Sequence, residues 1–80
     1  MTTERRASLD RRDMDALHRV LDWLAMDDAR TARIDYDEGE VRLCLEQPKR
    51  RGETEDAAYV GQSSDFAGAV DDCESDGWRP

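Results

Sequence analysis

Residues 32–46, which read Ala-Arg-Ile-Asp-Tyr-Asp-Glu-Gly-Glu-Val-Arg-Leu-Cys-Leu-Glu, decide the fold of this chain. Apolar and polar residues alternate over 32–37 and again over 40–46, which is the period of a half-buried strand. Gly39, in the Glu38-Gly39 pair between the two runs, is suited to a tight turn. The stretch therefore predicts an antiparallel hairpin.

The hydrophobic pattern also restricts the register of this hairpin. A two-residue or a four-residue loop keeps the apolar side chains of both strands on one face, whereas a three-residue loop would oppose apolar to charged residues. We expect one of the even-length loops. The cross-strand pairs would then be Tyr36–Val41 and Ile34–Leu43 on the core face and Asp35–Arg42 on the outer face.

An amphipathic helix is predicted before the hairpin. Asp10 is a suitable N-cap, and Asp13 lies in the first turn, where a carboxylate suits the helix dipole. The predicted core face, flanked by Trp23, comprises Met14, Leu17, Val20, Leu21, Leu24 and Ala25. This face fits a single helix packed on a core, and the alternative is a dimer seam.

The second half of the chain predicts a loop, a third strand and a second helix. Residues 47–55 are rich in charge with one Pro and one Gly, and 57–60 form a short strand candidate. Ser63 or Ser64 would cap the helix, and Gly77 would end it in a left-handed conformation with Trp78 folded back as a lid on the core. Its apolar face comprises Phe66, Ala69, Val70 and Cys73.

These elements predict one small α+β domain, a helix, a three-stranded antiparallel sheet and a second helix (αβββα), over 10–80. Residues 1–9 would form a flexible arm. The order resembles that of double-stranded-RNA-binding domains. That family has a lysine-rich start to its second helix, whereas residues 63–68 here read Ser-Ser-Asp-Phe-Ala-Gly. We therefore expect no direct binding to nucleic acid.

The sequence carries no pattern typical of an enzyme, a cofactor site or a metal site. Cys44, Cys73 and His18 are too few and too scattered for a zinc site, and two reduced thiols are expected. His18 and Asp22 have i,i+4 spacing, which fits an exposed pair better than a catalytic base. No membrane span or signal peptide is visible, so we expect a cytoplasmic protein that is not an enzyme.

Acidic residues are concentrated at the end of the chain. The sequence has 20 acidic and 12 basic residues, and residues 53–80 hold eight of the acids but a single arginine. The acids of the second helix lie mostly toward its C-terminus, where the dipole disfavours them. The predicted partner-binding residues are Glu53, Glu55, Asp56, Asp65, Asp71, Asp72, Glu74 and Asp76.

Three interpretations of this asymmetry remain open: a binding face, general solubility, and adaptation to high salt. A face of carboxylates repels nucleic acid and suits a basic partner, because it can occupy positions meant for phosphates. We therefore expect a partner that is itself a basic nucleic-acid-binding protein or complex, and no membrane.

In size, acidity and absence of catalytic motifs the chain resembles small phage-encoded anti-CRISPR proteins. This resemblance implies an inhibitor that blocks target-DNA binding by a CRISPR surveillance complex in a bacterial host. The alternatives are an antitoxin or regulator that covers a basic partner, and an accessory module of a larger assembly. A monomer is expected, although the antitoxin alternative would allow a dimer through the first helix.

Overall fold

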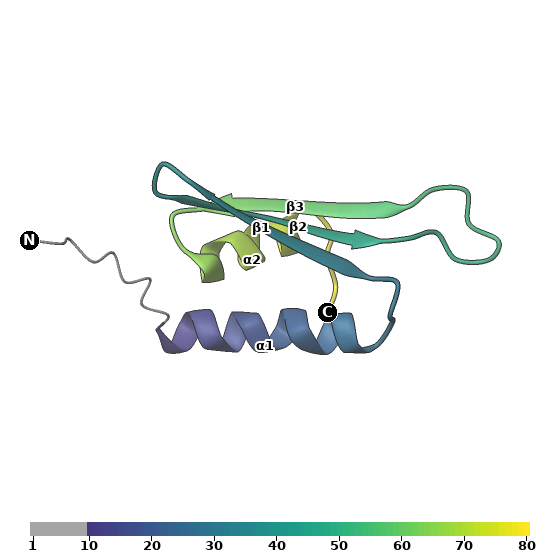
Figure 1. Ribbon diagram of the computed structural model, residues 1–80, viewed down its shortest axis with the longest axis horizontal. Coiled ribbons are helices and arrows are strands. Elements are labelled where there is room, and N and C mark those ends of the chain that lie inside the picture. Colours follow the sequence, from purple (N-terminus) through teal and green to yellow (C-terminus); the bar gives the residue numbers. More distant parts are fainter. Residues whose placement is uncertain (1–9) are drawn as a thin grey trace, which may run out of the picture.

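The computed structural model describes residues 10–80, and the expected arm 1–9 lies outside them. Its elements follow the predicted αβββα order, so the α+β fold class is confirmed (Figure 1). They are α1 (Arg11–Ala25), β1 (Thr31–Asp37), β2 (Glu40–Gln47), β3 (Ala57–Ser63) and α2 (Phe66–Ser75).

The hairpin of β1 and β2 has the shorter of the two expected loops. Asp37 pairs with Glu40 across a two-residue turn, in which Glu38 and Gly39 have φ angles of +50° and +81°. Positive φ at both positions defines a type I′ turn, whose twist matches that of the strands. The predicted pairs Tyr36–Val41, Ile34–Leu43 and Asp35–Arg42 are all confirmed.

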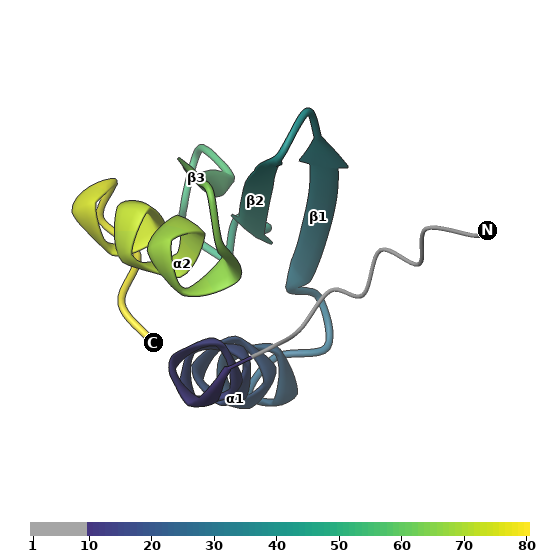
Figure 2. The same ribbon diagram turned by 90° about the vertical axis from the view of Figure 1, so that its left-hand side faces the viewer.

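The sheet has the order β1-β2-β3, and both helices lie on one of its faces (Figures 1 and 2). Helix α2 packs against β3 and β2, whereas α1 packs mainly against α2 and has few contacts with the sheet. Figure 2 shows β1 at the edge farthest from α2. The third strand is longer than the predicted 57–60 and reaches Ser63.

The predicted cap of α1 is confirmed, but its predicted core face is only partly right: Val20 is buried and Leu17 and Leu24 pack against the core, whereas Met14, Leu21 and Ala25 are exposed. Asp10 and Asp13 form a capping box, in which each side chain accepts a hydrogen bond from the backbone N–H of the other. The buried residues are Asp13, Ala16, Val20 and Trp23, while the expected Met14 and Leu21 are exposed. The buried face is rotated because α1 packs on α2 beside it rather than squarely on the sheet.

The two ends of α2 give one correction and one confirmation. Its N-cap is Asp65, which accepts a bond from the Gly68 N–H, rather than Ser63 or Ser64. At the other end Gly77 has a φ of +108°, and the Trp78 N–H donates to the Cys73 carbonyl at 3.0 Å. This is the predicted Schellman ending, and Trp78 is fully buried.

The two tryptophans join the ends of the helices in the core. The Trp23 and Trp78 rings meet edge to face at 5.9 Å between centroids. Leu43 and Leu45 of β2 are fully buried beneath the helices. Gly61 of β3 allows the close approach of α2, because an added Cβ there would lie 2.0 Å from the Ala69 carbonyl oxygen.

Candidate functional site

The predicted partner-binding acids of α2 are held by contacts within the protein. The side chains of Arg12 and Arg19 extend from α1 to acidic side chains on the facing side of α2. Arg12 lies 3.0 Å from Asp71 and 3.6 Å from Asp65, and Arg19 lies 3.6 Å from Asp71 and contacts Glu74. No arginine within α2 offsets these acids, but the neighbouring helix does. Asp71 and Glu74, which have no basic partner within α2, are therefore compensated by α1, and Asp65 at the helix N-terminus is paired with Arg12 as well.

Asp72 and Asp76 lie on the opposite side of α2, over the free edge of β3. The Gln62 N–H donates to Asp72 Oδ2, and the Val60 N–H donates to Asp76 Oδ2, both at 3.0 Å. These N–H groups point away from β2, so the two carboxylates cap a sheet edge that would otherwise be open. Within residues 10–80 neither carboxylate is within ion-pair distance of a basic side chain.

The remaining three predicted acids lie in the loop between β2 and β3, which extends past the end of the sheet (Figure 1). Glu53 accepts from the Arg50 N–H at 3.2 Å, and Asp56 accepts from the Lys49 N–H at 2.7 Å. These contacts order the loop. Glu55 has no hydrogen bond or ion pair with any residue that the structure describes.

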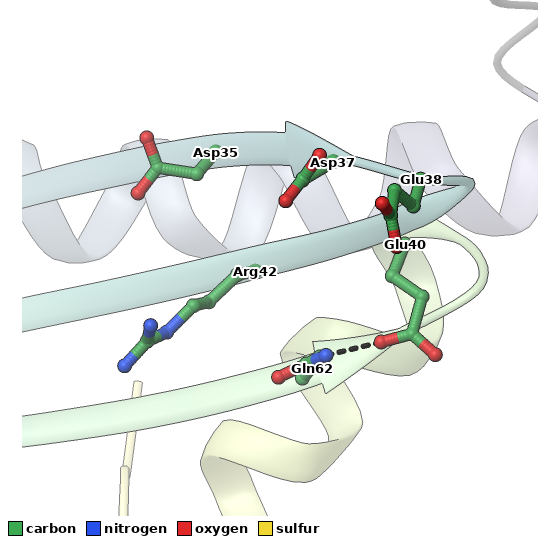
Figure 3. Close-up of a pocket in the computed structure, with 6 residues that line it drawn as sticks. All are labelled: Asp35, Asp37, Glu38, Glu40, Arg42 and Gln62. Atoms are coloured by element: carbon green, nitrogen blue, oxygen red, sulfur yellow. Dashed lines mark hydrogen bonds between the residues drawn. The ribbon is translucent and has the colours of Figure 1, made fainter.

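Sequence reasoning missed the acids at the hairpin end. An open pocket of about 450 Å³ lies there on the outer face of the sheet (Figure 3). It is lined by Asp35, Asp37, Glu38, Glu40, Arg42 and Gln62. Figure 3 shows the Arg42 guanidinium extending along the sheet away from the hairpin end. Asp35 is paired with Arg33 at 3.2 Å, whereas Asp37, Glu38 and Glu40 form no ion pair within residues 10–80.

Gln62 joins the hairpin acids to those of α2. Its side-chain amide donates to Glu40 while its backbone N–H donates to Asp72 (Figure 3 draws the first of these bonds). Carboxylates thus follow one another along the β3 edge and around the hairpin end. We call this surface the acidic strip, and its members are Asp37, Glu38, Glu40, Asp72 and Asp76.

The sequence contains part of the information needed to predict the hairpin carboxylates of the acidic strip. The Glu38-Gly39 turn correctly places the neighbouring carboxylates at the tip of a hairpin. Their proximity to Asp72 depends on how β3 pairs with β2, where Arg42 lies opposite Gln62. That register was not predicted, because the alternation of the third strand is too weak to fix it.

Both cysteines are free, and their environments favour the protonated thiol. Cys73 is fully buried, and burial, aided by the nearby Asp72 and Asp76 carboxylates, raises its pKa to about 12. Burial also raises the pKa of Cys44, with the neighbouring Glu46 contributing. A thiol is nucleophilic as the thiolate, so these environments fit packing roles.

Residues 10–80 contain no group of three or more His, Cys, Asp or Glu side chains arranged to hold a metal ion. His18 is exposed and has no hydrogen bond to Asp22. None of the helices described is both long and apolar enough to cross a membrane.

Comparison with known proteins adds no family to this description. No protein-family profile matches the chain, and neither the curated proteins nor the solved structures contain a match to it.

Proposed function

We propose that this protein uses the acidic strip to bind a positively charged surface of a nucleic-acid-binding protein and so keeps nucleic acid away from it. The observation that carries the proposal is the way in which Asp72 and Asp76 are fixed. One oxygen of each accepts a backbone N–H of β3 at 3.0 Å, and backbone groups within a strand move little. The second oxygen of each remains available to accept from a partner. Binding such pre-organised groups costs less side-chain entropy than binding mobile ones.

The charge of the strip supports the same conclusion. Its five carboxylates form no ion pair within residues 10–80, and all five side chains are exposed. Like charges at one edge create a local negative potential that accelerates the approach of a basic surface and repels nucleic acid. Because the charges are exposed, added salt should weaken the interaction.

The α2 acids outside the strip have a different part in this proposal. Asp65, Asp71 and Glu74 are paired with Arg12 and Arg19, which link α1 to α2 and offset two of the three negative charges. They position α2, and α2 in turn positions Asp72 and Asp76 over the β3 edge. The surface proposed to contact a partner therefore includes only Asp72 and Asp76 of α2 and not the other acids of this helix.

For the partner we propose a CRISPR surveillance complex, whose target-DNA channel is positively charged. Support comes from the sequence profile, since the chain is small, acidic and similar in these respects to anti-CRISPR proteins. Recovery of a basic toxin instead would favour the antitoxin alternative, and both outcomes use the same acidic strip.

Charge-neutral variants test the proposal with capture from a nuclease-treated bacterial lysate. The strip variant combines Asp37→Asn, Glu38→Gln and Glu40→Gln. Its matched control combines Asp15→Asn, Asp22→Asn and Asp28→Asn, which remove the same charge from exposed positions elsewhere. We expect the wild type and the control to recover the same basic protein at low salt and the strip variant to lose it. Equal recovery by the strip variant and the control would refute a role for the hairpin carboxylates, and with it the acidic strip as a continuous binding surface.

A further inference from the structure

The two edge strands of the sheet, β1 and β3, differ in whether side chains of residues 10–80 bond to their outward-pointing backbone groups. In a two-residue hairpin the residues flanking the turn form a hydrogen-bonded pair, and bonded and non-bonded pairs then alternate. Asp37, Asp35 and Arg33 therefore bond to β2, and the N–H and C=O groups of Ala32, Ile34 and Tyr36 point outward. The same alternation points Val60 and Gln62 of β3 outward, and those N–H groups are the ones that Asp76 and Asp72 cap.

The β1 edge has no comparable cover among residues 10–80. No side chain described there donates to or accepts from the backbone of Ala32, Ile34 or Tyr36. An uncovered strand edge is a template for another strand, and soluble proteins usually protect such edges. Among the residues that the structure describes, α2 protects the edge of β3, whereas nothing covers the edge of β1.

The helix-facing side of β1 is also apolar and exposed. Ile34 and Tyr36 share a face with the buried Leu43 of β2, yet they are 53% and 66% exposed. The reason is that α1 packs on α2 and has few contacts with β1. These side chains are placed for burial, and residues 10–80 of the same copy leave them exposed.

Helix α1 adds apolar surface on the same side. Met14 and Leu21 follow Arg12 and Arg19 by two residues each, a rotation of about 200° around a helix. Because the arginines contact α2, Met14 and Leu21 face away from α2. Figure 2 shows α2 and β1 over opposite sides of α1. They are 38% and 49% exposed.

We propose that two copies of this chain form a two-fold symmetric dimer by antiparallel pairing of their β1 edges, with Ile34 at the symmetry axis. The two three-stranded sheets would become one six-stranded sheet. The exposed apolar side chains of β1 and of the α1 flank would meet their counterparts beneath it. This surface shares only Asp37, the last residue of β1, with the acidic strip, and the proposal does not rest on the proposed function.

Charge complementarity selects the register. Centring on Ile34 places Arg33 of each copy opposite Asp35 of the other, so two opposite-charge pairs form on the outer face. Centring on Arg33 or on Asp35 would place that residue opposite its own copy, with like charges in contact. A shift that puts the axis between two residues would oppose apolar to charged side chains.

The hydrogen-bonding groups agree with this register. With Ile34 on the axis, its N–H donates to the C=O of Ile34 in the second copy, and Ala32 pairs with Tyr36 in the same way. These are the groups that point outward from β1. Arg33 and Asp35 then form a non-hydrogen-bonded pair, the arrangement in which opposite side chains come closest. The small Ala32 also leaves room for the Tyr36 ring of the second copy.

The dimer can be detected by sedimentation equilibrium of the full chain at concentrations up to ~1 mM, which covers dissociation constants of weak complexes. We expect a dimer for the wild type and a monomer for Ile34→Lys, which buries a charge at the axis. Val60→Lys is the matched control, because Val60 is an exposed apolar residue on the outer face of β3. It should remain dimeric. A monomeric wild type, or a dimer unaffected by Ile34→Lys, would overturn the proposal.

Charge reversal tests the register itself. In the R33D variant, an aspartate at position 33 of each copy lies opposite Asp35 of the other copy. In the D35R variant, an arginine at position 35 of each copy lies opposite Arg33 of the other copy. Each should raise the dimer dissociation constant at least about fivefold. The double variant R33D/D35R restores opposite charges across the axis and should recover most of the affinity. Circular dichroism and the unfolding midpoint would confirm that each variant is folded. A folded double variant that is no tighter than the single variants would contradict pairing centred on Ile34.

Discussion

The Asp13 side chain, in the first turn of α1, accepts a hydrogen bond of 2.9 Å from the backbone N–H of Ala67, in the first turn of α2. The same carboxylate also accepts from the Asp10 N–H within its own capping box. One buried carboxylate thus satisfies a free N–H group at the start of each helix and fixes how the two helices meet.

This contact predicts a specific dependence of stability on pH. The Ala67 N–H, helped by Asp10, lowers the pKa of Asp13 below its ordinary value of 3.8. The ionised carboxylate therefore stabilises the fold above pH 3.8, and this contribution is lost as the pH falls through the lowered pKa. Asp13→Asn should reduce the free energy of unfolding at pH 7, and its difference from the wild type should shrink as the pH falls below 3.8.

Denaturant unfolding of both proteins at a series of pH values gives this difference directly. Other carboxylates that titrate, such as Asp27, are common to both proteins and cancel in the comparison. A difference that stays constant from pH 7 down to the acid transition would show that the charge of Asp13 is not what matters.

The hairpin, the N-cap of α1 and the C-terminal end of α2 could be predicted from sequence because the signals there are local. Alternation and one glycine were enough to set Ile34 opposite Leu43, and the Gly77-Trp78 pair was enough to predict the Schellman ending. Each depends on backbone preferences within a few residues, which tertiary contacts did not override.

The orientation of α1 could not be predicted in the same way. Its hydrophobic stripe includes Met14 and Leu21, which are exposed, whereas the most deeply buried side carries Asp13, Ala16 and Trp23. The burial of an aspartate here depends on its bond to Ala67, which is 54 residues away in the chain, in addition to its local capping contact with Asp10. Hydrophobic periodicity takes no account of such a bond. Met14 and Leu21, which this orientation leaves exposed, are among the side chains that the proposed dimer would cover.

Half of the candidate site could not be predicted for a related reason. The α2 acids were recognised from charge alone, but their partners come from α1 and β3, and only the fold brings these together. Asp71 and Glu74 turn out to face arginines, whereas Asp72 and Asp76 face backbone N–H groups. Identical residue types on one helix therefore have different roles.

Gly61 should be intolerant of any side chain. A Cβ there would lie 2.0 Å from the Ala69 carbonyl and 2.8 Å from Cys73 Sγ, so α2 would have to move off β3. We expect Gly61→Ala to destabilise the protein by about 1–3 kcal/mol or more, as overpacking does. Ala58→Ser, at an exposed position of the same strand, should change stability by less than about 0.5 kcal/mol. Thermal or denaturant unfolding gives the free energy of unfolding of each variant. Equal values for the two variants would contradict close packing at Gly61.

The capping of the β3 edge predicts local protection of two amides. In the wild type the Val60 and Gln62 N–H groups should exchange slowly with solvent, because Asp76 and Asp72 accept from them. Asp72→Ala should accelerate exchange at Gln62 about tenfold, a change of about 1.4 kcal/mol, and leave Val60 nearly unaffected. Asp76→Ala should do the reverse. Hydrogen exchange followed by NMR separates the two sites, and Asp→Asn variants serve as controls because the amide oxygen can still accept.

The central claim is that the acidic strip occupies a surface that nucleic acid would otherwise use. The most direct measurement adds increasing amounts of duplex DNA to the complex of this protein with the basic partner recovered from lysate, and follows which species remain bound. We predict that each increment of DNA that binds the partner releases a matching amount of this protein. No complex should contain the partner, this protein and DNA together. A stable ternary complex, with DNA and this protein bound to the partner together, would contradict the claim.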